Sequence, residues 1–418
     1  MSLTKIKYSL FFSPGNSESC LAGLFEALLD EIKFPEKVIS MTFFTGEGDE
    51  REIEAIRQKI DKTLQRIYSD IFYPPFLVIS QPSLHVPEGI LLEACLLRNE
   101  YIQISYKADG DARYTLISNN SVKEFYGMYQ IQKGAYDTYE CFFNAFEKVS
   151  TILKKEGMGF SNVVRQWNYI GNILGRDDVL PSGGTNYAIF NRVRTLFYEK
   201  ENFCSGYPAA TGIGMKHRGI GISVIAGTFP KEQLKPVSNP LQINSYQYCS
   251  EKIAPGSDST NLPKFERALI HDSGEGEARI FVSGTAAIRG MNTVSKNNFR
   301  GQAEITFENI LQLVSDFIAG RPEIKTEYVR VYLKRKDDFI KWLKLIDRVP
   351  KVFGAKLLSV LQADICRDDL LLEIESSFYL KIPDHEKEGH MVSDGCTHNV
   401  SDLRFPEISS FPGTERHI

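Results

Sequence analysis

Residues 361–378 read LQADICRDDLLLEIESSF: an apolar run, a charged turn, and a second apolar run that carries two carboxylates. Side chains alternate between the faces of a β-strand, so Glu373 and Glu375 point to the same face. Burying a carboxylate among Leu and Ile is costly unless the group is paired or keeps its proton. A carboxyl that is protonated at neutral pH is a candidate general acid. The alternative is that both glutamates lie on the solvent-exposed face of an edge strand.

The composition places the chain among globular proteins. It has 418 residues, 42% hydrophobic and 24% charged, with a formal net charge of −4. The length allows two or three domains. This charge gives no broad basic surface for nucleic acid or an anionic membrane, and no apolar run approaches the ~18 residues of a membrane span. The seven cysteines are scattered, odd in number and form no CxxC pair, which predicts free thiols and a cytoplasmic location.

The first part of the chain, residues 1–157, alternates strand-like and helix-like segments, and its N-terminus reads as a first strand rather than a signal peptide. We find no catalytic constellation in this part. Strands are expected at 5–13, 37–45, 76–83, 101–108 and 113–121, and helices at 20–34, 49–72 and 144–157.

The second part, residues 158–378, is richer in glycine and aromatic residues. If residues 186–194 form a helix, Tyr187, Asn191 and Arg194 share one face, which suits a small anion with hydroxyl groups; the alternative is a solvated polar face. Alternating strands and helices predict an α+β fold, a sheet with helices on one face. Strands are expected at 221–229, 281–288, 327–335, 357–366 and 370–378, and helices at 303–320 and 337–349.

Residues 379–418 are polar and poor in aliphatic side chains, so we expect a tail on the surface or without fixed structure. The spacing of its metal-ligand residues matches no standard site, and we predict no metal centre there. These residues are His385, His390, Cys396 and His398.

Six motifs in a fixed order resemble the chorismatase family, also grouped as pteridine-dependent dioxygenase-like proteins. The motifs are Arg165–Tyr169 (RQWNY), Tyr187–Arg194 (YAIFNRVR), Pro208–Gly214 (PAATGIG), Pro263–Ala268 (PKFERA), Val282–Ile288 (VSGTAAI) and Gln362–Glu375 (QADICRDDLLLEIE). One departure is Gly290–Thr293, reading GMNT, where the family usually has GHES.

The resemblance implies a RidA/YjgF-like (chorismate-mutase-like) mixed sheet backed by helices for residues 158–378, and a degenerate relative of it for residues 1–157. It implies an enzyme that cleaves the enolpyruvyl ether of chorismate and releases pyruvate. Glu373 would protonate the enolpyruvyl methylene, with no metal or organic cofactor. RidA relatives are trimers, but a chain with two such halves could act as a monomer.

Two further residues bear on the product that the resemblance implies. Cys366 and Gly284 match the branch that forms 3-hydroxybenzoate, and a related branch forms 4-hydroxybenzoate as well. A hydrolytic branch carries alanines instead and yields 3,4-dihydroxycyclohexa-1,5-dienoate. The residues leave two rival functions open, a RidA-like imine or enamine hydrolase and a ligand-binding protein without enzymatic activity.

Chorismate is a dianion, so its site needs at least two cationic groups, and tyrosines could bind its hydroxyl or a carboxylate. The backbone of the glycine-containing turn could also approach the substrate closely. The predicted substrate-binding residues are Arg165, Tyr187, Arg194, Thr211, Gly212, Arg267, Arg330 and Tyr332.

Overall fold

The structure is a computed structural model. It describes residues 6–15, 18–33, 36–68, 72–98, 102–119, 122–134, 136–176, 184–248, 262–274, 276–318, 324–346 and 358–381. The predicted tail beyond residue 381, with its histidines, and the helix end at Gly320 lie outside these residues.

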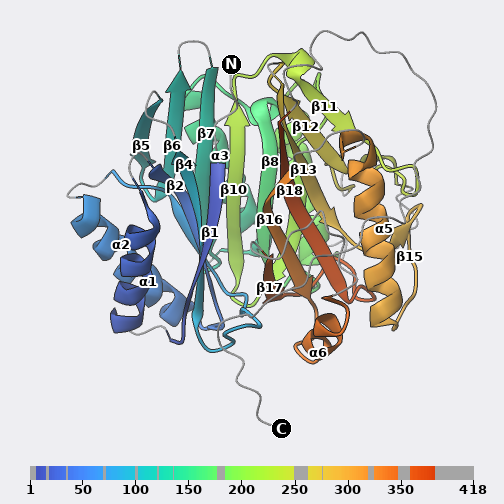
Figure 1. Cartoon of the computed structure of the whole chain (residues 1–418), viewed down its shortest axis with the longest axis horizontal. Coiled ribbons are helices and arrows are strands. Elements are labelled where there is room, and N and C mark those ends of the chain that lie inside the picture. Colours follow the sequence, from blue (N-terminus) through green and yellow to red (C-terminus); the bar gives the residue numbers. More distant parts are fainter. Residues whose placement is uncertain are drawn as a thin grey trace.

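Three sheets form the framework of the described chain (Figure 1). The first, in the order β1-β4-β2-β3, comprises Ile6–Ser13, Ile90–Arg98, Glu36–Thr45 and Phe76–Ile79. The second, β5-β6-β7-β10-β8-β9, comprises Gln103–Asp109, Ala112–Asn119, Val122–Gln132, Gly219–Gly227, Val163–Gly171 and Ala209–Met215. The third, β11-β12-β13-β18-β16-β17, comprises Leu234–Val237, Ala268–Asp272, Glu277–Thr285, Leu372–Lys381, Ile324–Leu333 and Leu358–Gln362. A small hairpin pairs β14, Ile288–Arg289, with β15, Asn292–Thr293.

Each sheet packs against a pair of helices through its own hydrophobic cluster. Figure 1 shows α1 and α2 at one side of the molecule and α5 at the other. The spacing of buried residues in α2, at Ile53, Ile56, Ile60 and Leu64, explains why this segment forms a helix with one apolar face. The pairs are α1 Glu18–Glu31 with α2 Glu50–Tyr68, α3 Thr138–Lys155 with α4 Asn186–Tyr198, and α5 Phe299–Ile318 with α6 Asp338–Leu343.

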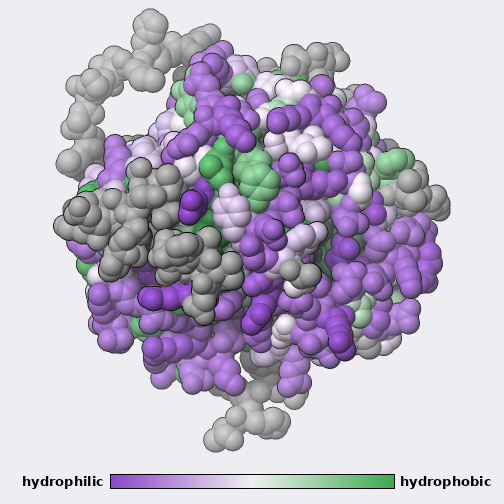
Figure 2. Space-filling view, turned by 180° about the vertical axis from the view of Figure 1, so that it is seen from behind, coloured by the Kyte–Doolittle hydropathy of each residue, from purple (hydrophilic) through white to green (hydrophobic). Residues whose placement is uncertain are grey.

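A fourth cluster joins all three sheets in the interior of the molecule. Phe44 of the first sheet, Trp167 of the second and Tyr328 of the third belong to it. The three sheets therefore share one core, and any charged group on these inner faces is far from water. Outside, the face seen in Figure 2 is mostly hydrophilic, with a cluster of apolar side chains in its upper half. Among the described residues, no helix is long and apolar enough to cross a membrane.

The predicted α+β class is confirmed, and the third sheet is mixed, since β16 pairs parallel with β17 and antiparallel with β18. Four strands that lie inside their sheets, β4, β7, β8 and β12, are absent from the sequence prediction. The segment ILLEACLLR of β4 is buried on both faces except at its last residue, so it lacks the alternation that marks a half-exposed strand. The helix predicted at 337–349 is shorter, ending as α6 at Leu343.

The second sheet takes strands from both sides of residue 157. β7 pairs with β10 from Gly219 opposite Gln132 to Gly227 opposite Glu124. The division of the chain at residue 157 stays a prediction, and two units divided there would be hydrogen-bonded to each other through this pair.

Candidate active site

Strand β18 separates its side chains onto two buried faces. Leu372 and Ile374 pack in the cluster beneath α5, whereas Glu373 and Glu375 point toward the shared interior. The strand lies between β13 and β16, not at an edge, and both glutamates are buried. The alternative of two solvent-exposed carboxylates on an edge strand is therefore wrong, and each carboxyl must be accounted for in a low-dielectric interior.

Glu375 is fully buried and accepts hydrogen bonds from two cations and three neutral donors. A carboxyl surrounded only by donors is stabilised as an anion. Burial alone would raise its pKa, but Arg165 and Arg330 outweigh that effect, and the pKa lies below its usual range. The donors are Arg165 Nη2 at 2.5 Å, Arg330 Nη1 at 2.8 Å, the Tyr332 hydroxyl at 2.9 Å, Trp167 Nε1 at 3.0 Å and the Thr211 hydroxyl.

Glu373 has the opposite surroundings. Its side chain is 4% exposed, and no group among the described residues donates a hydrogen bond to it. Burial, followed by repulsion from the Glu375 anion, raises its pKa to about 8, although Arg165 and Arg267 act in the other direction. The carboxyl is therefore mostly protonated at neutral pH and has a proton to give.

Gly284 lies directly against this carboxyl. A Cβ at this position would be 2.0 Å from Oε1 of Glu373 and 3.3 Å from Cγ2 of Thr211. The pairing of β13 with β18 shifts register between Val282 and Thr285, and this irregularity coincides with the close approach. The Gly284 amide donates to the Thr211 hydroxyl at 3.1 Å, so one threonine connects the glycine to Glu375.

Cys366 is placed near Glu373 by a backbone contact between sheets. Ile213 of β9 forms an isolated bridge with Ile365, and the Gly214 amide donates to the Asp364 carbonyl at 2.8 Å. Burial, then repulsion from Glu373, raises the pKa of the Cys366 thiol to about 12. The thiol is thus protonated at neutral pH, which points to a steric role and not to a nucleophilic one.

Helix α4 brings Tyr187 to the same place. Its N-cap is Thr185, whose side chain accepts from the Ala188 amide, so Tyr187 lies in the first turn. A Cβ on Gly212 would be 3.1 Å from the Tyr187 ring. Burial raises the pKa of this phenol, and Cys366 adds to the shift. The structure thus brings Tyr187 and Gly212, two of the predicted substrate-binding residues, together beside Cys366.

Three predicted arginines are buried and keep a nitrogen without a partner among the described residues. Arg194 donates to Asn191 Oδ1 at 2.6 Å, while its Nε is unpaired. Arg267 donates to the Tyr248 hydroxyl at 2.5 Å, and its Nε is unpaired as well. In Arg165, which binds Glu375, the unpaired atom is Nη1. Buried donors in this state suit an anionic ligand.

Arg330 and Tyr332 have a different place from the one expected of substrate-binding residues. Arg330 donates to both carboxylate oxygens of Glu93 and also to Glu375, so all three of its side-chain nitrogens have acceptors. The Tyr332 hydroxyl likewise donates to Glu375. We therefore assign no substrate contacts to these two residues, because their donors are used within the protein.

Sequence reasoning missed three neighbours of the site. Glu93 lies in a strand that was not predicted, and Tyr248 lies outside all six motifs. Arg367 directly follows Cys366, and this adjacency in the sequence could have identified it as a neighbour of the site. It donates to the Met291 carbonyl at 2.8 Å and lies 5.6 Å from the Tyr248 ring centre. The GMNT segment, which departs from the family pattern, is thus hydrogen-bonded to the bend after β17 that carries Cys366.

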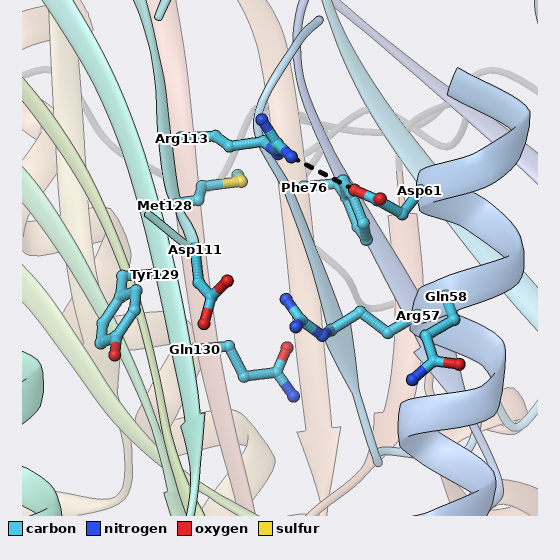
Figure 3. A pocket seen from close by; sticks show the side chains of 9 residues that line it. All are labelled: Arg57, Gln58, Asp61, Phe76, Asp111, Arg113, Met128, Tyr129 and Gln130. Atoms are coloured by element: carbon cyan, nitrogen blue, oxygen red, sulfur yellow. Dashed lines mark hydrogen bonds and ion pairs between the residues drawn. The ribbon is translucent and has the colours of Figure 1, made fainter. Parts of the chain in front are cut away.

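A cavity of about 110 Å³ elsewhere in the molecule is poorly suited to a dianion (Figure 3). It lies between α2 and the second sheet, and its lining includes Arg57 and Arg113 but also Asp61 and Asp111. Figure 3 shows Arg113 and Asp61 turned toward each other, 3.4 Å apart. With two charges of each sign, this cavity offers no net attraction for an anion. Within the described ranges, no group of His, Cys, Asp and Glu could hold a metal ion.

Comparisons with known proteins agree with this geometry. Residues 100–226 match the family model described as Chorismatase FkbO/Hyg5-like, N-terminal. A crystal structure of a chorismatase superposes on 90% of this chain and 99% of its own, with a TM-score of 0.61 and 19% identity. This chain is related to the chorismatases.

Two curated relatives show the same kinship in sequence. A 3-hydroxybenzoate synthase of Streptomyces hygroscopicus is 31% identical over 231 residues, 53% of this chain and 64% of the relative. A chorismatase of Streptomyces rapamycinicus is 27% identical over 246 residues, 52% of this chain and 64% of the relative. The chain thus covers less than two thirds of the length of the curated chorismatases that it matches. The resemblance predicted from the six motifs is confirmed, and the chorismatase fold extends over nearly the whole chain.

Proposed function

We propose that this protein is a chorismatase that cleaves the enolpyruvyl ether of chorismate and releases pyruvate, with 3-hydroxybenzoate as the main aromatic product. The observation that carries the proposal is the contrast between two adjacent inward carboxyls, one held as an anion by five donors and one kept as an acid. Pairs of carboxyls whose surroundings separate their pKa values mark acid and base assignments in active sites.

In the proposed reaction, Glu373 transfers its proton to the methylene carbon of the enolpyruvyl group. The π electrons form the new C–H bond, and positive charge develops on the carbon that bears the ether oxygen. Glu373 is then an anion beside this cation, so the charges separate over a short distance in a buried site. The bond between the ether oxygen and the ring then breaks, its electron pair stays on the oxygen as the keto group of pyruvate, and the ring rearranges and returns one proton to Glu373 as it becomes aromatic. Pyruvate and 3-hydroxybenzoic acid together contain the atoms of chorismic acid, so this route consumes neither water nor a redox partner.

Arg194 and Arg267, with the free nitrogen of Arg165, are the proposed partners of the two substrate carboxylates. Each has a buried N–H without an acceptor among the described residues. A bound dianion would satisfy these donors and orient the methylene toward the acid. It would also cancel part of the positive charge that favours ionisation of Glu373, so substrate binding would itself help to keep the acid protonated.

The product branch is proposed from Gly284 and Cys366. Both residues lie beside Glu373, one through a van der Waals approach and the other through its electrostatic effect. Residue size at these positions would determine whether water reaches the cation. The hydrolytic branch, which adds one water and yields the dihydrodiol, and a mixed 3- and 4-hydroxybenzoate product are the alternatives. We further propose that the protein acts in the cytoplasm, which its free cysteines favour, and that it acts as a monomer.

The decisive experiment is incubation of the purified protein with chorismate, followed by chromatography of the aromatic products and enzymatic measurement of pyruvate. We expect equal amounts of pyruvate and hydroxybenzoate. A parallel incubation with a 2-imino acid tests the RidA-like alternative: ammonia release from it without pyruvate release from chorismate would reject the proposal. Binding of chorismate without turnover would favour a ligand-binding protein instead.

A further inference from the structure

We infer that Glu93, from the first sheet, is a positioning residue of the active site: it offsets the charge of Arg330 and so allows Glu375 to keep Glu373 in its protonated form. The inference rests on the proposed function in so far as Glu373 is the general acid. It assigns a part in the reaction to the N-terminal sheet, where sequence analysis found no catalytic constellation.

The contacts form an unbroken chain from one sheet to the other. Glu93 on β4 is buried, and its carboxylate accepts from Nε of Arg330 at 2.9 Å and from Nη2 of the same guanidinium. The third nitrogen, Nη1, donates to Glu375 at 2.8 Å. The guanidinium also lies 5.1 Å from the Tyr328 ring centre and 5.3 Å from that of Trp167, so its orientation is fixed on its faces as well as its edges.

The charges along this chain sum to zero. Glu93 and Glu375 are negative, Arg330 and Arg165 are positive, and none of the four side chains is more than 4% exposed. Because the ionised form of Glu373 is negative, each uncompensated positive charge near it favours loss of its proton. Removing Glu93 alone would leave one uncompensated cation beside Glu375 and would favour ionisation of Glu373.

The other charged or titratable groups around these carboxyls do not replace Glu93. Among the described residues near Glu373, Arg267 is a cation, whereas Cys366, Tyr187 and Tyr332 are neutral at pH 7. Near Glu93, besides Arg330, lie Cys95 and Tyr169, which are also neutral at pH 7.

The size of the effect follows from distance and screening. On β16, Arg330 is paired with Glu375, and Tyr332 is paired with Glu373. Arg330 is therefore displaced by two residues, about 7 Å along the strand, from the position opposite Glu373. Glu93 is on the order of 10 Å from Glu373. A cavity of about 20 Å³ beside Glu93 and Arg330 has room for about one water molecule, so screening there is weak. One charge at this distance changes the pKa of a buried group by about one pH unit.

The test is a charge cycle of three variants, Glu93→Gln, Arg330→Met and the double variant, compared with the unchanged protein. Two readouts are used: the pH dependence of kcat/KM for pyruvate release, and a pH titration of the Glu373 side chain by NMR with ¹³C-labelled glutamate, assigned with Glu373→Gln. We expect the alkaline limb of the pH profile, where kcat/KM falls, to shift to lower pH by about one unit in Glu93→Gln. In Arg330→Met it should shift to higher pH by a similar amount. In the double variant, which is neutral again, the limb should return close to its original position.

A merely structural role for Glu93 would lower activity at every pH without moving the limb, and that result would overturn the inference. If Glu93→Gln does not fold, the same substitution is judged in the Arg330→Met background, where it must move the limb down by about one pH unit. If the unchanged protein releases no pyruvate from chorismate, the proposed function fails. The NMR titration still decides the inference about Glu93, because it requires no turnover.

Discussion

Glu373 and Glu375 lie two residues apart on the same face of β18, yet among the described residues only Glu375 receives hydrogen bonds. One strand therefore holds an anion and an acid side by side. The anion raises the pKa of its neighbour, and the arginines that bind it are kept from pairing with Glu373. This division of roles between two identical residue types would permit the proposed proton donation at neutral pH.

Replacing Glu373 with Gln should abolish pyruvate release while chorismate still binds. The amide keeps the shape of the side chain but has no proton to transfer, and general-acid catalysis contributes typically 10²–10⁴-fold. We expect kcat to fall by at least about 10²-fold. Pyruvate formation and calorimetric binding of chorismate measure the two effects. Glu304→Gln, at an exposed position of α5, is the matched control and should behave like the unchanged protein. Near-normal turnover of Glu373→Gln would reject the assignment.

The same substitution should make the protein more stable, increasingly so as the pH rises. Folding raises the pKa of Glu373 from 4.5 to about 8, so the native state binds a proton that the unfolded state has lost. The free energy of unfolding of the unchanged protein therefore decreases as the pH rises from 4.5 to about 8, and this group causes no further decrease above that pH. The difference in unfolding free energy should be small at pH 4.5 and reach a few kcal/mol at pH 8 and above, because a pKa difference of one between the two states corresponds to about 1.4 kcal/mol. Urea denaturation at several pH values measures it; a constant difference would contradict the raised pKa.

The rate of the unchanged enzyme should decline in alkaline solution. Because the acid must be protonated in the free enzyme, kcat/KM is expected to fall above a pH of about 8, tenfold per pH unit. Chorismate is already a dianion at neutral pH, so its own ionisation does not produce this limb. A profile that stays flat to pH 10 would show that Glu373 does not supply the proton.

Adding a methyl group at position 284 should displace the acid. In Gly284→Ala the new Cβ would be 2.0 Å from Oε1 of Glu373, a distance that atoms do not tolerate, so the carboxyl must move. Displacement of this order typically costs up to about 10²-fold in rate. Gly23→Ala is the control, since a Cβ there meets nothing within 4 Å and alanine favours a helix. Unchanged kcat in Gly284→Ala would show that the glycine does not confine the acid.

Shortening Cys366 should change the product more than the rate. Its partly buried thiol is protonated and is not a nucleophile, so Cys366→Ala mainly opens space beside Glu373. Water could then reach the cation, and the dihydrodiol should increase relative to 3-hydroxybenzoate. Chromatography of the product mixture tests this, with Cys204→Ala at an exposed site as the control. An unchanged product ratio would argue against the proposed branch.

Local patterns were enough to predict most strands and helices of the outer layers, because amphipathic spacing reports which face is buried. They failed at β4, β7, β8 and β12, which lie inside their sheets; β4, for example, is buried on both faces and shows no alternation. The motifs correctly gathered Glu373, Gly284, Thr211 and Cys366 into one place.

The sequence could not show which of the predicted arginines are engaged within the protein. Arg330 and Arg194 have the same chemistry, and only the position of Glu93, 237 residues away from Arg330, shows that Arg330 is already engaged. The fate of a buried charge depends on its partner, and partners across sheets leave no local signal.

The pairing of β7 with β10 also determines which truncated forms of the chain can fold and when this sheet can form during synthesis. A fragment beginning at residue 158 would leave β10 with a bare edge from Gly219 to Gly227, including Ile220, Ile222 and Val224. Such an edge invites association with other chains. During synthesis, β8 cannot form its antiparallel pairing until β10 has been made, because β10 follows it in the sequence. We expect truncation products ending before residue 227 to be insoluble, and we expect the nascent chain to depend on chaperones until that strand emerges.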